Sequence, residues 1–96
     1  MSVLIEGHRF VADYPHGSGN EPIFRCIVEV ARTGWAAFIF DCRQRDAHNK
    51  PVEVYSDLFI DGPEHGRALV EKILPRLLDR SGLQHAPLTW QEVSTE

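Results

Sequence analysis

The sequence predicts an α+β fold: a three- or four-stranded antiparallel sheet in meander order, covered on one face by a C-terminal helix kinked near Pro75. Two observations carry the prediction. Residues 23–43 hold two segments of alternating apolar and polar side chains around Arg32-Thr33-Gly34, a pattern typical of a β-hairpin. Residues 68–78 place apolar side chains at helical spacing, which indicates one apolar stripe that a sheet would cover.

The hairpin register follows from the need for one apolar face. A two-residue turn at Thr33-Gly34 would place Asp41 opposite Cys26 and mix charge into the buried face. A three-residue loop with a left-handed Gly34 places Phe40 opposite Cys26 and leaves that face wholly apolar. We therefore expect Phe40, with its neighbour Phe38, to face the helix. The side chains expected on the outer face are Ile27, Trp35, Ala37 and Ile39.

Two further strands are expected around this hairpin. Residues 3–14 predict a first strand with blurred alternation, and residues 52–60 alternate as a half-buried strand does. Turn-forming residues at 15–22 and 44–51 separate the strands.

The helix is expected to begin at Asp61-Gly62-Pro63-Glu64, where Asp61 and Glu64 resemble a capping box and Pro63 suits the first turn. Ser81-Gly82 predicts its end. Pro75 lacks the N–H that would bond to residue 71, so we expect either a kink or a short second helix beginning at Pro75.

Length and composition are those of one small globular domain. We expect residues 1–96 to form it, with a core at about 8–82 and a C-terminal tail at 83–96. No segment approaches the roughly 20 apolar residues of a membrane span, and the start does not resemble a secretory signal, so a cytoplasmic protein without membrane contact is expected. A net charge of -4 disfavours nucleic acid as a partner.

Candidate residues for chemistry are few, and no catalytic residue, metal site or cofactor is assigned. The five histidines lack the short spacings of zinc ligands. Cys26 and Cys42 are expected to be buried, reduced thiols, because the predicted register places them too far apart for a disulfide. An alternative hypothesis places a small-molecule site at the strand-to-helix junction, where Asp57, Glu64 and His65 cluster in the sequence.

The outer sheet face carries the stronger prediction. Ile27, Trp35 and Ile39 would be exposed there, rimmed by charged residues, as in an association surface. Trp90 is too large an apolar group to lie in water without a contact. It is expected either to join this interface or to anchor the tail over the same face.

Strands followed by a helix resemble, in architecture only and over residues 24–80, the HicB-type antitoxins; no family motif accompanies the resemblance, so it implies no site residues. The leading function is a non-enzymatic interaction module, a homodimer or the binder of a protein partner. The alternatives are a small-molecule-binding or weakly catalytic domain at the strand-to-helix junction, and a nucleic-acid-associated regulatory domain using Arg43, Arg45 and Lys50.

Overall fold

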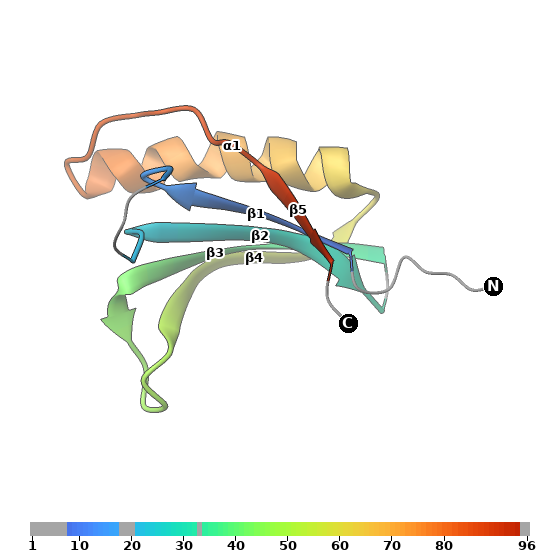
Figure 1. The fold of residues 1–96 in the computed structure, drawn as a ribbon, viewed down its shortest axis with the longest axis horizontal. Helices are drawn as coiled ribbons and strands as arrows, with labels where there is room; N and C mark the ends of the chain where they lie inside the picture. Colours follow the sequence, from blue (N-terminus) through green and yellow to red (C-terminus); the bar gives the residue numbers. More distant parts are fainter. Residues whose placement is uncertain (1–7, 18–20, 33, 95–96) are drawn as a thin grey trace.

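The fold is an antiparallel five-stranded sheet with one helix on one of its faces (Figure 1). A computed structural model describes residues 8–17, 21–32 and 34–94. The sheet order is β4-β3-β2-β1-β5. The elements are β1 (His8–Tyr14), β2 (Phe24–Ala31), β3 (Gly34–Arg45), β4 (Pro51–Ile60), α1 (Pro63–Arg80) and β5 (Gln91–Ser94).

The predicted meander is confirmed for four strands, because β1 to β4 are each hydrogen-bonded to the next in chain order. The predicted strand count was wrong: Gln91–Ser94 adds a fifth strand beside β1. This four-residue segment is polar at three of its positions, so it lacks the apolar alternation from which a strand is predicted. Its pairing depends on the path that the preceding chain takes. The part of the first predicted strand before residue 8 lies outside the described residues.

The predicted register of β2 against β3 was wrong by one residue. Ala31 pairs with Gly34, so only two residues separate the strands, and Cys26 lies opposite Ile39. Ala37 and Ile39 are therefore fully buried on the helix-covered face, whereas Phe38 and Phe40 lie on the other face. Gly34 suits the start of β3 because its φ of +136° is unfavourable for other residues.

A buried carboxylate explains why this register is stable. Phe24 pairs with Asp41, which is only 3% exposed. The two Asp41 oxygens accept hydrogen bonds from the Arg43 backbone N–H (2.9 Å), the Arg43 guanidinium (3.0 Å to each oxygen) and the Gln44 amide (2.9 Å). A charge can be buried when it is paired and hydrogen-bonded in this way. Our rejection of registers with Asp41 on the buried face ignored these donors.

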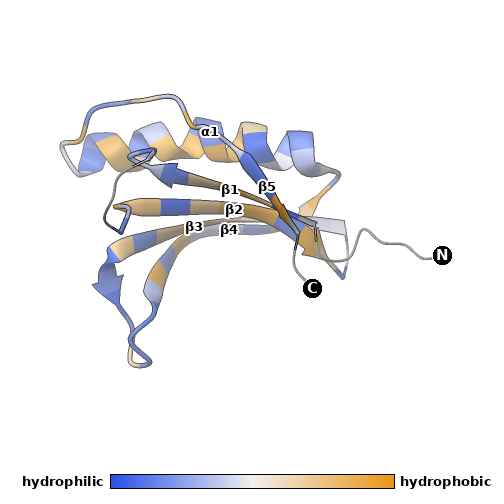
Figure 2. Cartoon of the chain, in the orientation of Figure 1, coloured by the Kyte–Doolittle hydropathy of each residue, from blue (hydrophilic) through white to orange (hydrophobic). Residues whose placement is uncertain are grey.

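Apolar packing between α1 and the sheet forms the core. In Figure 2 apolar and polar residues recur along α1 as expected for a helix with one buried face. The buried positions of the helix are Gly66, Val70, Leu74 and Leu78. They pack against a cluster on the sheet that includes Ala12, Phe24, Cys26, Val28, Ala37, Ile39 and Ile60.

The helix ends differ partly from expectation. Pro63 is in the first turn as predicted, but the N-cap is Gly62 without a side-chain cap, and the Asp61 carboxylate is fully exposed. The capping-box prediction was therefore wrong. The helix is continuous from Pro63 to Arg80, so no second helix begins at Pro75 (Figure 1).

The C-terminal end of α1 redirects the chain along the helix. Gly82 has a φ of +69°, its N–H bonds to the Asp79 carbonyl, and the Leu83 N–H bonds to the Leu78 carbonyl at 2.8 Å. This pattern is a Schellman motif, which favours glycine at the left-handed position. Leu83 then packs against the core, so the tail folds back toward the sheet edge where β5 forms.

The Asp41 network predicts a specific acid dependence of stability. Hydrogen bonds from Arg43, above all, hold the pKa of Asp41 below its usual value. A carboxyl whose folded pKa is lowered stabilises the fold above its unfolded pKa of about 3.9, and this contribution is lost as the pH falls through the folded pKa. Asp41→Asn should lower the free energy of unfolding at pH 7 by about 1.5 to 3 kcal/mol.

Urea unfolding of both proteins at pH 7 and near pH 3 measures this effect, with Asp61→Asn as the exposed control. The difference between wild type and Asp41→Asn should narrow at the lower pH. A difference that is constant over this range would show that the Asp41 charge does not stabilise the fold.

The close approach of α1 to the sheet predicts the effect of a small substitution. A Cβ on Gly66 would lie 2.8 Å from Cγ1 of Val28, which is fully buried and cannot move aside freely. The clash should outweigh the gain in helix propensity of about 1 kcal/mol. We expect Gly66→Ala to lower the free energy of unfolding by about 1 to 2 kcal/mol. Gly62→Ala, where a Cβ meets nothing within 4 Å, is the matched control; increased stability of Gly66→Ala would contradict this packing.

Candidate functional site

The structure places the three predicted ligand-binding residues on separate features. Asp57 lies in β4, where its carboxylate accepts the backbone N–H of Phe59 at 3.0 Å. Glu64 and His65 lie exposed in the first turn of α1, and His65 approaches Asp61 at 4.0 Å. Among the described residues, no hydrogen bond or ion pair joins Asp57, Glu64 and His65, and none of the three lines a hollow discussed below.

Two of the predicted interface residues, Trp35 and Ile39, lie on the helix-covered face instead. Ile39 is fully buried in the core, and Trp35 packs partly buried against the same core, with its ring 6.2 Å from that of Phe10. Both changes follow from the one-residue shift of the hairpin register, which exchanges the two faces of β3. Ile27 does lie on the outer face, opposite Phe38.

Trp90 anchors the tail to its own chain, but on the helix side. Its indole N–H donates to Glu71 of α1 at 2.8 Å, and its ring packs against the core. Tyr14 of β1 also holds the tail, because its hydroxyl donates to the Gln84 carbonyl. The described part of the tail, up to residue 94, therefore follows the helix and reaches the edge of the sheet, and it does not cross the outer face.

The outer face has an apolar row at its centre. Val11, Ile27 and Phe38 are consecutive cross-strand partners on β1, β2 and β3, and each is half-buried. Phe40 follows on the same face, with its ring stacked on that of Phe38 at a centroid distance of 5.9 Å. No described helix covers this face, since α1 lies on the opposite side (Figure 1).

Two ion pairs flank the apolar row, one on each side. Arg9 Nε contacts Glu29 Oε1 at 3.0 Å, and Arg25 Nε contacts Asp13 Oδ1 at 2.9 Å. All four side chains are between 31% and 46% exposed, so each pair is open to solvent on the outer face. The Asp13 hydrogen bond raises the pKa of Arg25 above its usual value.

A hollow of about 430 Å³ adjoins this face at the Arg25 end, between the middle of the sheet and the start of β4. Ile27, Phe40 and Pro51 are among its lining residues, and Lys50 and Glu53 also line it. The register of β4 against β3 shifts at three places, between Trp35 and Ala37, between Ile39 and Phe40, and between Asp41 and Arg45. The large apolar side chains exposed on β4 are Val54, Leu58 and Phe59, and Phe59 is 77% exposed.

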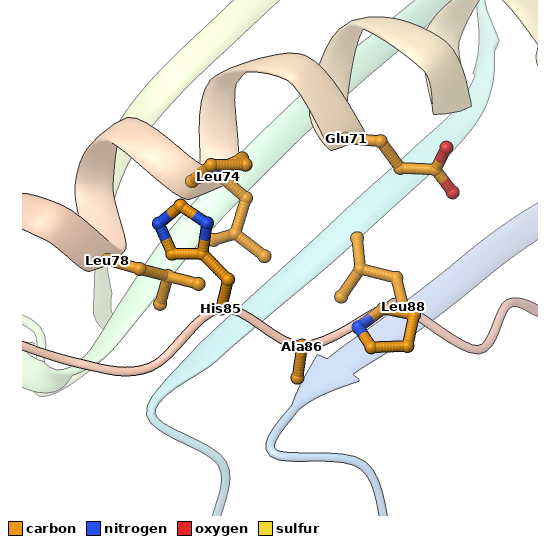
Figure 3. A pocket seen from close by; sticks show the side chains of 8 residues that line it. Glu71, Leu74, Leu78, His85, Ala86 and Leu88 are labelled. Atoms are coloured by element: carbon orange, nitrogen blue, oxygen red, sulfur yellow. The ribbon is translucent and has the colours of Figure 1, made fainter.

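A second hollow, of about 240 Å³, lies between α1 and the tail (Figure 3). Leu74 and Leu78 point into it from the helix, and His85 to Leu88 close it from the tail. His85 also contacts Asp79 at 2.7 Å, which ties the tail to the helix. A third, of about 190 Å³, lies between the end of β1 with the loop that follows it and the tail at Thr89 and Gln91.

The basic residues that suggested a nucleic-acid contact are largely neutralised. Arg43 is paired with Asp41, and Arg45 with Glu21. Only Lys50 of this group has no acidic partner among the ion pairs of the described residues. A phosphate-binding patch requires free cations close together, and in this group both Arg43 and Arg45 of β3 are held in ion pairs.

Both thiols are buried and have raised pKa values. Cys26 and Cys42 are free and buried. Burial raises the pKa of Cys26 to about 12 and raises that of Cys42 as well. Over the described part of the chain, no three histidine, cysteine or acidic side chains gather as metal ligands would. The described residues also contain no helix that is both long enough and apolar enough to cross a membrane.

Comparisons with family models, curated proteins and solved structures find no match for this chain. The site must therefore be interpreted from its own geometry.

Phe38 and Phe40 lie on the outer face, although the sequence pattern predicted them on the inner one. The available signal was the pair Arg43 and Gln44 just after Asp41, which supplies enough donors to bury that carboxylate. With Asp41 accepted on the inner face, the aromatic side chains move to the outer face and Ile39 moves inward.

The cysteine environments predict low thiol reactivity. The thiolate is the nucleophile, and a raised pKa keeps both thiols protonated at pH 8. We expect neither cysteine of the folded protein to be alkylated by iodoacetamide during an incubation that fully modifies both in denaturant, as measured by intact mass. Rapid alkylation of Cys26 in the folded protein would contradict its placement in the core.

Proposed function

We propose that the protein is a non-enzymatic interaction module that self-associates as a homodimer through the outer face of its sheet. The observation that carries this proposal is the apolar row Val11–Ile27–Phe38, on a face that no described helix covers. Ile27 was among the predicted contacts. Phe38 and Phe40 replace Trp35 and Ile39, and Trp90 is not part of the surface.

The composition of this face suits protein association. Specific interfaces combine a central apolar patch, often aromatic, with a charged or polar rim. Here the stacked rings of Phe38 and Phe40 lie near the centre, and the Arg9–Glu29 and Arg25–Asp13 pairs lie at the rim. Apolar surface removed from water contributes about 25 cal/mol per Å², so burying this row against another apolar surface would be favourable.

The face is a better contact than either edge of the sheet. At one edge, β4 has register irregularities and carries Glu53 and Asp57, features that oppose pairing with a further strand. At the other edge, β5 has only four residues. The face, in contrast, offers apolar side chains from several strands at once.

Substitution at the centre of the row tests the proposal. Phe38→Glu would bring a charge into the contact, so the variant should be a monomer under conditions where wild type is a dimer. Light scattering across a range of protein concentrations measures the solution mass. Ala68→Glu, on the exposed side of α1, adds the same charge away from the face and should leave the dimer intact.

Thermal unfolding of all three proteins shows whether the variants remain folded. A wild type that is monomeric at every concentration would refute self-association. A Phe38→Glu variant that dimerises as well as wild type would exclude this face as the contact.

A further inference from the structure

The charges beside the apolar row have an order that a second copy of the chain can match. On one side of the row the order is Arg9 on β1 and Glu29 on β2; on the other side it is Asp13 on β1 and Arg25 on β2. Each strand therefore carries opposite charges on the two sides of its central residue. The two sides are complementary to each other strand by strand.

A two-fold axis along the apolar row would bring these complementary sides together. This axis lies between the two facing sheets and is perpendicular to the strands. It places each strand over the same strand of the second copy, and the two strands run in opposite directions. Arg9 then lies over Asp13 of the second copy, and Glu29 lies over Arg25 of the second copy. The residues on the axis, Ile27 and Phe38, face their own counterparts, as an isologous interface requires.

We propose that the partner is a second copy of the chain in this orientation; this inference rests on the self-association proposed above. The dimer then has one charge quartet on each side of a shared apolar row, and the two quartets are related by the two-fold axis. Each quartet contains the Arg9–Glu29 pair of one copy and the Arg25–Asp13 pair of the other. The four charges alternate in sign around the quartet, so every charge has opposite neighbours both within its chain and across the interface.

An axis along the strands, between β1 and β2, is the main competing arrangement. It also pairs opposite charges, because Arg9 would face Glu29 of the other copy and Asp13 would face Arg25. However, it exchanges the two halves of the sheet, so Phe38 of β3 would lie over the region of β5, where Gln91 continues the row. The perpendicular axis instead buries the stacked rings of Phe38 and Phe40 at the centre, and this is why we favour it.

The same orientation gives the exposed Phe59 a partner surface. Phe59 lies in β4 on the Arg9 side of the row, whereas the hollow of about 430 Å³ lies on the Arg25 side, lined by Phe40 and Pro51. Reversing the strand direction brings the Phe59 end of β4 over the hollow end of its copy. An aromatic side chain that is 77% exposed in one chain would then meet an apolar hollow in the other.

Exchanging charges within each ion pair tests the orientation without breaking either pair. The first variant carries Asp13→Arg with Arg25→Glu, and the second carries Arg9→Glu with Glu29→Arg. Each keeps opposite charges within its own chain, but in the proposed orientation every contact across the interface becomes one between like charges. Each variant alone should dimerise about 100-fold more weakly than wild type.

Mixing the two variants should restore the dimer, because the altered side of one then faces the altered side of the other. A chain with all four substitutions should again dimerise with itself. Native mass spectrometry distinguishes the mixed dimer from the two homodimers by mass, and light scattering at several concentrations gives the affinities. Circular dichroism and thermal unfolding show that each variant is folded.

The outcomes separate this inference from the function on which it rests. If the first variant alone dimerises like wild type, the orientation is overturned and an axis along the strands is indicated, while self-association remains. If wild type itself is monomeric, self-association fails and the orientation with it. Monomeric single variants that form a mixed dimer would establish the quartets.

Discussion

The register of β2 against β3 is the constraint on which the rest of the structure depends. Because side chains alternate across a strand, a shift of one residue would exchange the buried and exposed sets of β3. The register is held at both ends of the hairpin. At one end, Ala31 pairs with Gly34. A residue with a Cβ at position 34 would place that atom 3.0 Å from the Ile60 carbonyl oxygen, so this position favours glycine. At the other end, Asp41 is fixed by Arg43 and Gln44, and Arg43 also reaches Ser81 beyond the end of α1.

This register determines how close the helix can lie. Ala37 and Ile39 face α1 from β3. Gly66 faces the sheet from the helix, and it lies so close to Val28 that there is no room for a Cβ at position 66. In the alternative register, Phe38 and Phe40 would occupy the inner face and push the helix outward. The core therefore combines small side chains at the closest approach with Leu74 and Leu78 farther along the helix. As a consequence, the large aromatic side chains of β3 are left on the outer face.

Much of the architecture could be predicted from local patterns, whereas the site could not. The strand alternation, Pro63 in the first turn and the stop at Ser81-Gly82 are local signals, and the structure agrees with them. Predicting the register required a comparison between the cost of burying the Asp41 carboxylate and the hydrogen bonds that it accepts. The rule that buried faces are apolar fails at Asp41, because three donor groups surround its carboxylate. The fifth strand depended on the tail path that Gly82 and Leu83 set, and Asp61 lost its capping role because Gly62 occupies the N-cap. The error at Asp41 then passed directly into the predicted interface at Trp35 and Ile39.

The ion pairs of the outer face contribute little to the stability of the fold, but they can determine how two copies of the chain associate. Exposed pairs such as Arg9–Glu29 contribute roughly 0 to 1 kcal/mol to stability, so they do little for the isolated chain. Bringing them into an interface would remove water from four charges, and this is unfavourable unless each charge meets an opposite one. Their order on β1 and β2 meets that condition when one copy is reversed along its strands. Charges that contribute little to the stability of one chain can thus select the orientation of two, while the apolar row between them supplies the favourable free energy of contact.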